Sequence, residues 1–151
     1  MAPPTRTQLA RARALLARAE ARFAGAEAVV RRDTPNGGEF DNNFDGVVSG
    51  IFHIVDAFEL ATTGLGREMR EADQATRIAS VVTALRGAGI TDLPATARLV
   101  GLNARRNTSV HGDWLEVLDR DELDAAVRAG QGLLEAVRAY LDRMIEKDVG
   151  R

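Results

Sequence analysis

The residues best suited to chemistry lie in one stretch of the chain, Arg105 to Trp114, with the sequence RRNTSVHGDW. His111 is one of only two histidines in the chain. Its imidazole can exchange a proton near neutral pH. Arg106 lies five residues earlier and carries a guanidinium that can hold a phosphate with two parallel hydrogen bonds. The pair suits phosphodiester transesterification, in which a ribose 2′-hydroxyl attacks the adjacent phosphate and no metal ion is required.

The spacing of this pair sets a geometric condition. Residues five apart point about 140° apart on an ideal helix, whereas Asn107 and His111 share a face. Arg106 therefore converges with His111 only through its long side chain, or because the helix ends at His111. Gly112 favours such an ending. The alternative is that His111 caps a helix and Arg106 forms an ordinary salt bridge.

Four further residues bear on this candidate chemistry. Arg105 is a candidate second phosphate contact. Trp114 is a candidate for stacking on a base, although a lone tryptophan also suits covering the end of a core. Asp113 would repel a phosphate. His53 is either a second acid–base group or an ordinary surface or interface histidine.

Composition limits the other classes of function. The chain has 151 residues, enough for one domain with a sizeable core, and a net charge of −2 that attracts neither nucleic acid nor anionic membranes globally. It has no cysteine, which excludes disulfides, thiolate nucleophiles and cysteine-based zinc sites. With two histidines lacking metal-ligand spacing, we expect no metal and no cofactor. Without an apolar leader or membrane-length run, we expect a cytoplasmic protein with no membrane partner.

Helical periodicity runs through most of the chain, and no segment alternates with a period of two. Five helices are expected: one after a cap at residue 5 or 7 that ends near 31–32, one from about 40 to around 62–66, one over about 69–85, one from 94 into the stretch that ends at 111, and one from 120 that frays after about 146. Thr5 or Thr7 can cap the first, and Asp119 with Glu122 has the spacing of a capping box for the last. Pro94 is expected in the first turn of the fourth helix. The expected inward residues include Leu9, Ala12, Leu16, Ala19, Phe23, Ala26 and Val30 in the first helix, Ala75, Ile78, Val82 and Leu85 in the third, and Ala97, Val100 and Leu102 in the fourth.

Two helix faces have open interpretations. Gly46, Gly50, His53 and Ala57 form a line of mostly small residues. Because glycine weakens a helix, this line predicts close contact with another helix, in the same chain or in a second subunit. On the first helix the face opposite the apolar stripe carries Arg11, Arg18 and Arg22. These arginines are either a solvated surface or a strip that guides RNA.

The fold class predicted from these patterns is all-α. The helices form an antiparallel bundle of four principal helices plus a short helix that leads into the motif formed by Arg106 and His111. Residues 1–151 form a single domain.

The motif and its context resemble a known family. Arg106-Asn107-x-x-Val110-His111-Gly112, late in an all-helical chain and followed by a long last helix, is similar to the HEPN (higher eukaryotes and prokaryotes nucleotide-binding) domain. The resemblance covers nearly the whole chain in helix order, and the motif is its specific part. It implies a homodimer in which two such motifs face one another, with Arg106 and His111 as the catalytic pair and Asn107 as a positioning residue.

The resemblance also implies a class of activity. Many members of the family are metal-independent endoribonucleases that act as toxins, in phage defence or in RNA processing, so RNA and a cognate antitoxin protein are the expected partners. Others are non-catalytic modules that bind a nucleotide, RNA or a protein, and this alternative stays open, as does a bundle whose motif is only structural. The chain departs from one subgroup, because Asp113 stands where toxins modified by their antitoxin have a tyrosine. The only tyrosine, Tyr140, is expected to pack on the last helix.

Overall fold

The computed structural model describes residues 3–32, 39–62, 73–110 and 118–149. The helices in these ranges are α1 (Arg6–Arg31), α2 (Glu39–Thr62), α3 (Gln74–Gly87), α4 (Thr96–Val110) and α5 (Arg120–Val149). The described ranges hold no strand, and the prediction of an all-α bundle is confirmed. No helix in this part of the chain is long and apolar enough to cross a membrane.

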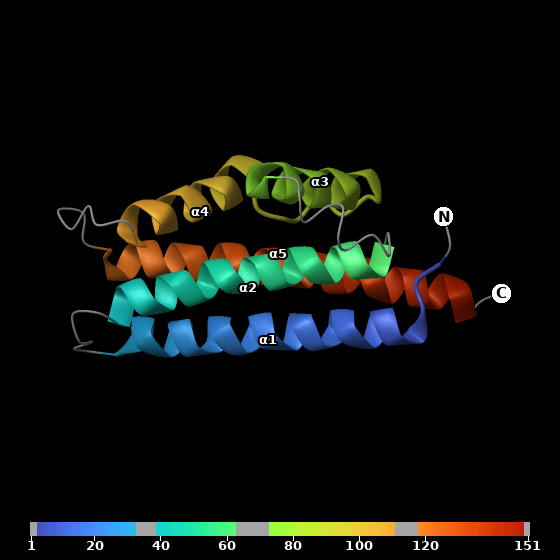
Figure 1. Cartoon of the computed structure of the whole chain (residues 1–151), viewed down its shortest axis with the longest axis horizontal. Coiled ribbons are helices and arrows are strands. Elements are labelled where there is room, and N and C mark those ends of the chain that lie inside the picture. The colour runs from blue at the N-terminus through green and yellow to red at the C-terminus, as the bar shows by residue number, and fades with distance from the viewer. Residues whose placement is uncertain (1–2, 33–38, 63–72, 111–117, 150–151) are drawn as a thin grey trace.

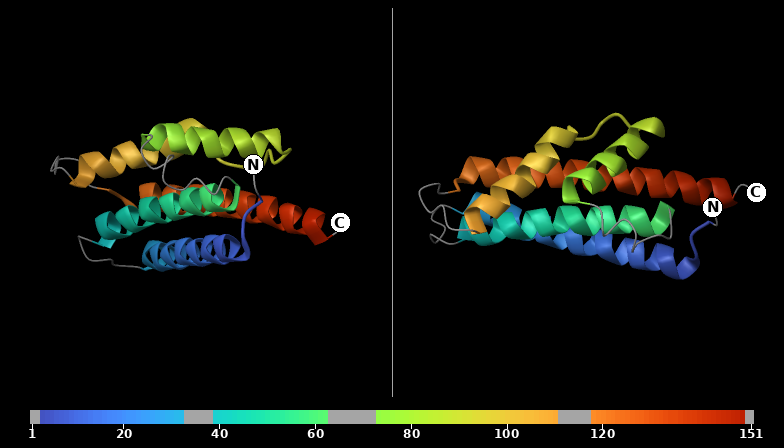
Figure 2. Two further views of the ribbon diagram at one scale, coloured as in Figure 1. Left: turned by 45° about the vertical axis from the view of Figure 1, so that its right-hand side comes forward. Right: turned by 45° about the horizontal axis from the view of Figure 1, so that its top comes forward.

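The helices form a bundle with a second layer on one side. α1, α2 and α5 pack against one another along their lengths, and α3 and α4 cover one side of this group, over α2 and α5 (Figure 1). The other two views show the same order, with α2 between α1 and the α3–α4 pair (Figure 2). α1 and α4 end, and α2 and α5 begin, at one end of the molecule, which we call the motif end. The first turn of α1 and the last turn of α5 lie at the opposite end.

Side-chain caps explain where three of the helices start. Thr5 caps α1 in a full capping box with Gln8, as the sequence predicts. Asp119 accepts a 2.8 Å hydrogen bond from the backbone of Glu122 at the start of α5, so this predicted cap is also confirmed. Asp73 caps α3 through the backbone of Thr76.

The centre of the bundle is organised by one aromatic ring between two glycines. Phe23 of α1 is 1% exposed, and its ring fits against Gly50 of α2 and Gly130 of α5. A Cβ atom added at Gly130 would lie 2.6 Å from Cζ of Phe23, and one added at Gly50 would lie 2.9 Å from Cε1. Real Cβ atoms do not approach so closely, so both helices need glycine here to close around the ring.

This packing decides which helix lies against the small-residue line of α2. Gly50 faces Phe23 and the backbone of Ala19, and Arg22 lies nearest to Gly46. The neighbour is therefore α1 of the same chain. Gly46 and His53 of the same line are only half-buried, so a contact of a second subunit at these two residues stays a prediction.

We expect Gly130→Ala to lower the free energy of unfolding by about 1–3 kcal/mol, since the added methyl group collides with a ring that has no room to move. The matched control is Gly25→Ala in α1, where no described atom lies within 4 Å of the new Cβ. That variant should gain about 1 kcal/mol from helix propensity. Urea denaturation of both variants measures the difference. Equal effects of the two substitutions would contradict the close fit around Phe23.

A buried ion pair attaches α3 to α2. Arg77 donates from Nε and Nη2 to the two carboxylate oxygens of Glu59, both at 3.0 Å, and Nη2 also bonds Asp56. Arg77 is 8% exposed and Glu59 is 3% exposed. The hydrogen bonds to Glu59 raise the pKa of the Arg77 guanidinium above its ordinary value. The pair is thus a fully charged link between two helices.

Several expectations for α3 and α4 were wrong in detail. Helix α3 begins at Gln74 rather than near Met69, because Asp73 caps it. Ala75 is exposed, whereas Arg77 takes an inward position. Helix α4 begins at Thr96 rather than at Pro94.

Two contacts give the reasons for the changes in α4. The carbonyl of Ala95 accepts from Leu99 to open the helix, and the Pro94 ring lies against Gly132 of α5 instead of joining the first turn. Among the described side chains of α4, Leu99 is buried at 1% exposure and Ala97 is exposed, while Val100 and Leu102 are half-buried and pack against the core as expected.

Candidate functional site

Helix α4 carries the first part of the motif to the motif end of the bundle. Arg105 and Arg106 lie in its second half, and the helix spans residues up to Val110, which directly precedes His111. Asn107 is in the helix, but its side chain lies outside the described part of the structure. The predicted roles of His111 and Trp114, and the position of Asp113, also fall outside the described residues.

Arg106 is held by groups on both α4 and α2. Its Nη2 donates to Oδ1 of Asn103, one turn earlier, at 3.1 Å. Its guanidinium carbon lies 5.9 Å from the centre of the Phe52 ring, within range of a cation–π interaction. Its Nε is 3.8 Å from Oδ1 of Asp45, too far for a hydrogen bond. The side chain is 19% exposed, so the guanidinium is positioned and still reaches solvent.

Other arginines at the motif end are bound more tightly to acceptors. Arg105 donates to Oε2 of Glu122 on α5 at 3.2 Å. Arg32 pairs with Glu39 at 2.8 Å, and Arg120 donates to the carbonyl of Arg32 at 2.6 Å. These contacts tie together the helix ends. Arg105 is therefore bound to a carboxylate on α5. Arg106 differs, because it has no hydrogen bond to a carboxylate among the described residues.

The support for Arg106 extends to α3. Asn103 donates from Nδ2 to Oε1 of Gln74 at 2.8 Å, and this bond fixes the amide so that its oxygen faces Arg106. Sequence reasoning missed Asn103, Phe52 and Asp45 as neighbours of the motif. Asn103 was detectable, because residues three apart on a helix are neighbours. The other two lie on a separate helix, and no sequence spacing points to them.

His53, the other histidine, lies on α2 and is half-buried. Burial and the positive charge of Arg22 lower its pKa from the ordinary value of 6.5; Arg18 lowers it further and Asp56 opposes the shift. The imidazole is therefore mainly neutral at pH 7. The described residues contain no cluster of side chains that could hold a metal ion.

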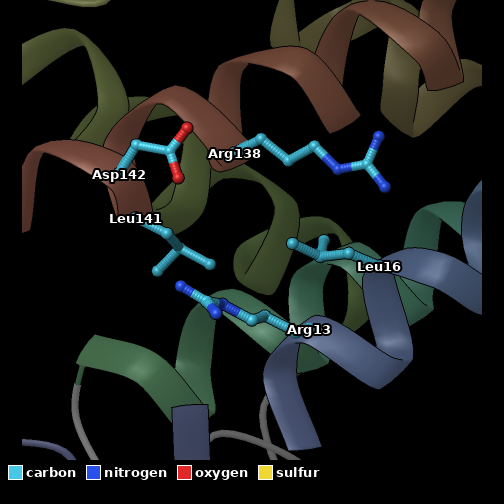
Figure 3. A pocket seen from close by; sticks show the side chains of 5 residues that line it. All are labelled: Arg13, Leu16, Arg138, Leu141 and Asp142. Carbon is cyan, nitrogen blue, oxygen red and sulfur yellow. The ribbon is translucent and has the colours of Figure 1, made fainter. Parts of the chain in front are cut away.

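A hollow elsewhere on the molecule is a poorer site. It has a volume of about 300 Å³ and lies between α1 and α5, with Arg13 and Leu16 from α1 and Arg138, Leu141 and Asp142 from α5 (Figure 3). Its two leucines are at most 4% exposed, and Arg138 already pairs with Glu20 at 2.7 Å. The hollow is therefore lined by the core leucines and by one arginine that is already neutralised, and none of its described lining residues belongs to the motif.

Comparison of the chain with protein-family models, with curated proteins and with solved structures found no match.

Proposed function

We propose that the protein is a HEPN-like, metal-independent endoribonuclease of a toxin–antitoxin or defence system. The observation that carries the proposal is the environment of Arg106, a guanidinium oriented by Asn103 and Phe52 without a hydrogen-bonded carboxylate among the described residues. A pre-positioned guanidinium stabilises the charge that develops on a phosphate during cleavage, because it needs no reorganisation at that moment.

The reaction is a transesterification within RNA. The 2′-oxygen attacks the adjacent phosphorus and gives up its proton to the neutral imidazole of His111. The bond from phosphorus to the 5′-oxygen breaks, and that oxygen takes a proton from an imidazolium. Arg106 binds the non-bridging oxygens, and Asn107 orients the reacting groups. The products are a 2′,3′-cyclic phosphate and a 5′-hydroxyl.

The two proton transfers support a homodimer as part of the proposal. One chain offers one motif histidine, and in-line cleavage benefits from a base on one side of the phosphorus and an acid on the other. Two copies with facing motifs supply both groups. The active form is therefore a dimer, and activity per chain should fall on dilution below the dissociation constant of the dimer.

The test is incubation of the purified protein with mixed-sequence RNA in EDTA. We expect cleavage to continue in the chelator and the new ends to carry 2′,3′-cyclic phosphate, which mass spectrometry detects. Complete loss of cleavage in EDTA, or ends bearing only 5′-phosphate, would refute the proposed chemistry.

A second candidate is a non-catalytic module that binds RNA. The observation in its favour is Asp45, whose carboxylate lies 3.8 Å from Arg106 and opposes phosphate binding at that residue, so that RNA would be held by other arginines and left uncleaved. RNA binding by the folded wild-type protein, without cleavage of any RNA offered, would favour this second function over the first.

A further inference from the structure

One face of α2 is open between two neighbouring helices. It carries Gly46, Ser49 and His53, which are all half-buried and share one side of the helix. α2 runs between α1 on one side and α4 on the other, in Figure 1 and in both views of Figure 2. We call the face formed by these three residues the α2 strip.

Helix α1 supplies two arginines along one border of the α2 strip. Nη1 of Arg22 lies 3.8 Å from the position of a Cβ on Gly46, so its side chain reaches across to α2. Arg18 lies one turn earlier on the same side of α1. Because α1 and α2 run in opposite directions, this places Arg18 further along α2. Both guanidinium groups act on His53 electrostatically.

These two arginines are not neutralised within the described structure. Both are exposed, and among the described residues neither has a carboxylate within 4.0 Å. The carboxylate that raises the pKa of His53 is that of Asp56, and this carboxylate is bound by Arg77. The border of the α2 strip toward α1 is therefore locally positive on a chain with a net charge of −2.

Helix α4 supplies a third guanidinium on the opposite border. Arg106 contacts Asp45 and Phe52 of α2, which are the sequence neighbours of Gly46 and His53. Arg22 and Arg106 thus approach the same turns of α2 from two sides. Fixed positive groups on both borders match the negative charges along a nucleic acid backbone.

We propose that the α2 strip binds the phosphate backbone of single-stranded RNA, with Arg18 and Arg22 on one border and Arg106 on the other. This inference rests on the proposed ribonuclease function and supplies the path by which the substrate reaches Arg106. Guanidinium groups hold phosphates with two hydrogen bonds, and the neutral imidazole of His53 adds one N–H donor. A single strand is required because in-line attack needs a ribose that can turn, which a duplex prevents.

The test measures binding of a fluorescein-labelled, mixed-sequence RNA 20-mer by fluorescence anisotropy. All proteins carry His111→Ala so that the RNA stays intact. Adding Arg18→Gln and Arg22→Gln together should weaken binding at least about tenfold, since two charge-assisted contacts are lost. The slope of log K against the logarithm of the salt concentration should become shallower by about 1.4, because each of the two lost phosphate contacts on a single strand contributes about 0.7.

The matched control adds Arg13→Gln and Arg98→Gln, which make the same change in net charge. Both arginines are exposed and line hollows bordered by α5 (Figure 3 shows the one with Arg13). The control should bind RNA like its parent, with the same salt dependence. Equal weakening by both double variants, or no binding by the parent, would overturn the proposal.

His53 provides a second readout, because it is the only histidine left after His111→Ala. Its NMR titration should show a pKa that rises when RNA binds, since phosphates add negative charge beside Arg18, Arg22 and Asp56, the charged groups that now act on it. A titration unchanged by saturating RNA would count against the site.

The outcomes separate this inference from the proposed function. If wild-type protein cleaves RNA and the Arg18→Gln, Arg22→Gln variant cleaves and binds equally well, the α2 strip is refuted and the ribonuclease stands. If wild-type protein binds RNA through these arginines but never cleaves it, the α2 strip stands and the ribonuclease is refuted.

Discussion

Replacing His111 with alanine is expected to lower the rate of RNA cleavage by about 100-fold to 10,000-fold, the usual contribution of a general acid–base group. Arg106→Ala should cost about 100-fold to 1,000-fold, because it removes a pre-positioned donor from the developing charge. Single-turnover cleavage of a defined RNA in EDTA measures both effects, and far-ultraviolet circular dichroism verifies that the variants are folded.

Two further variants sharpen this prediction. Arg106→Lys keeps the positive charge but loses the two-pronged geometry, so its rate should fall between those of wild type and Arg106→Ala. Arg98→Ala removes an exposed arginine from the same helix and should leave cleavage unchanged. Unaltered cleavage in either alanine variant of the motif would remove that residue from the mechanism.

Arg77→Met is expected to lower the free energy of unfolding by about 3–5 kcal/mol, the usual result of removing one partner from a buried ion pair. The charge of Glu59, at 3% exposure, would lose its two hydrogen bonds from the guanidinium. The second change, Glu59→Leu, should recover much of this loss, because an apolar pair of similar volume no longer has a charge to desolvate. Guanidinium chloride denaturation of the single and double variants measures the effect.

Arg86→Met is the control for this substitution, since Arg86 is exposed on the same helix. Its unfolding midpoint should stay close to that of wild type. The double variant distinguishes a buried ion pair from simple packing: if it is as unstable as the sum of the two single variants, the charges of Arg77 and Glu59 do not interact as the structure indicates.

The parts of the fold that follow from local rules were predictable from the sequence. The periodicity of α1 identified Ala12, Leu16 and Phe23 as buried, and the caps at Thr5 and Asp119 were recognisable from their side chains. Tyr140 packs against Phe58, with ring centres 5.2 Å apart, which also confirms the expectation for that residue.

The parts that depend on tertiary partners were not predictable in this way. Arg77 interrupts the apolar pattern of α3, and only the carboxylate of Glu59 on another helix makes its burial favourable. The small-residue line of α2 indicated a close neighbour but could not identify it, because the answer depends on where Phe23 of α1 places its ring.

The candidate site likewise combines features that the sequence shows with features that only the tertiary structure shows. The spacing of Arg106 and His111 is visible in the sequence, and so is the arginine face of α1. The approach of Arg22 and Arg106 to neighbouring residues of α2, Gly46 and Asp45, is not visible in the sequence, because it requires α1 and α4 to flank the same helix. Sequence reasoning therefore identified the candidate chemistry but not the surface that surrounds it.

The placement of the helix ends makes the two ends of the molecule different. The first turn of α1 and the last turn of α5 lie at the same end of the molecule, opposite to the end of α4 (Figure 1). A molecule tethered to a sensor chip through either of these turns would point the motif end into solution. Immobilisation through the opposite end therefore leaves the motif end accessible to RNA or to a protein partner.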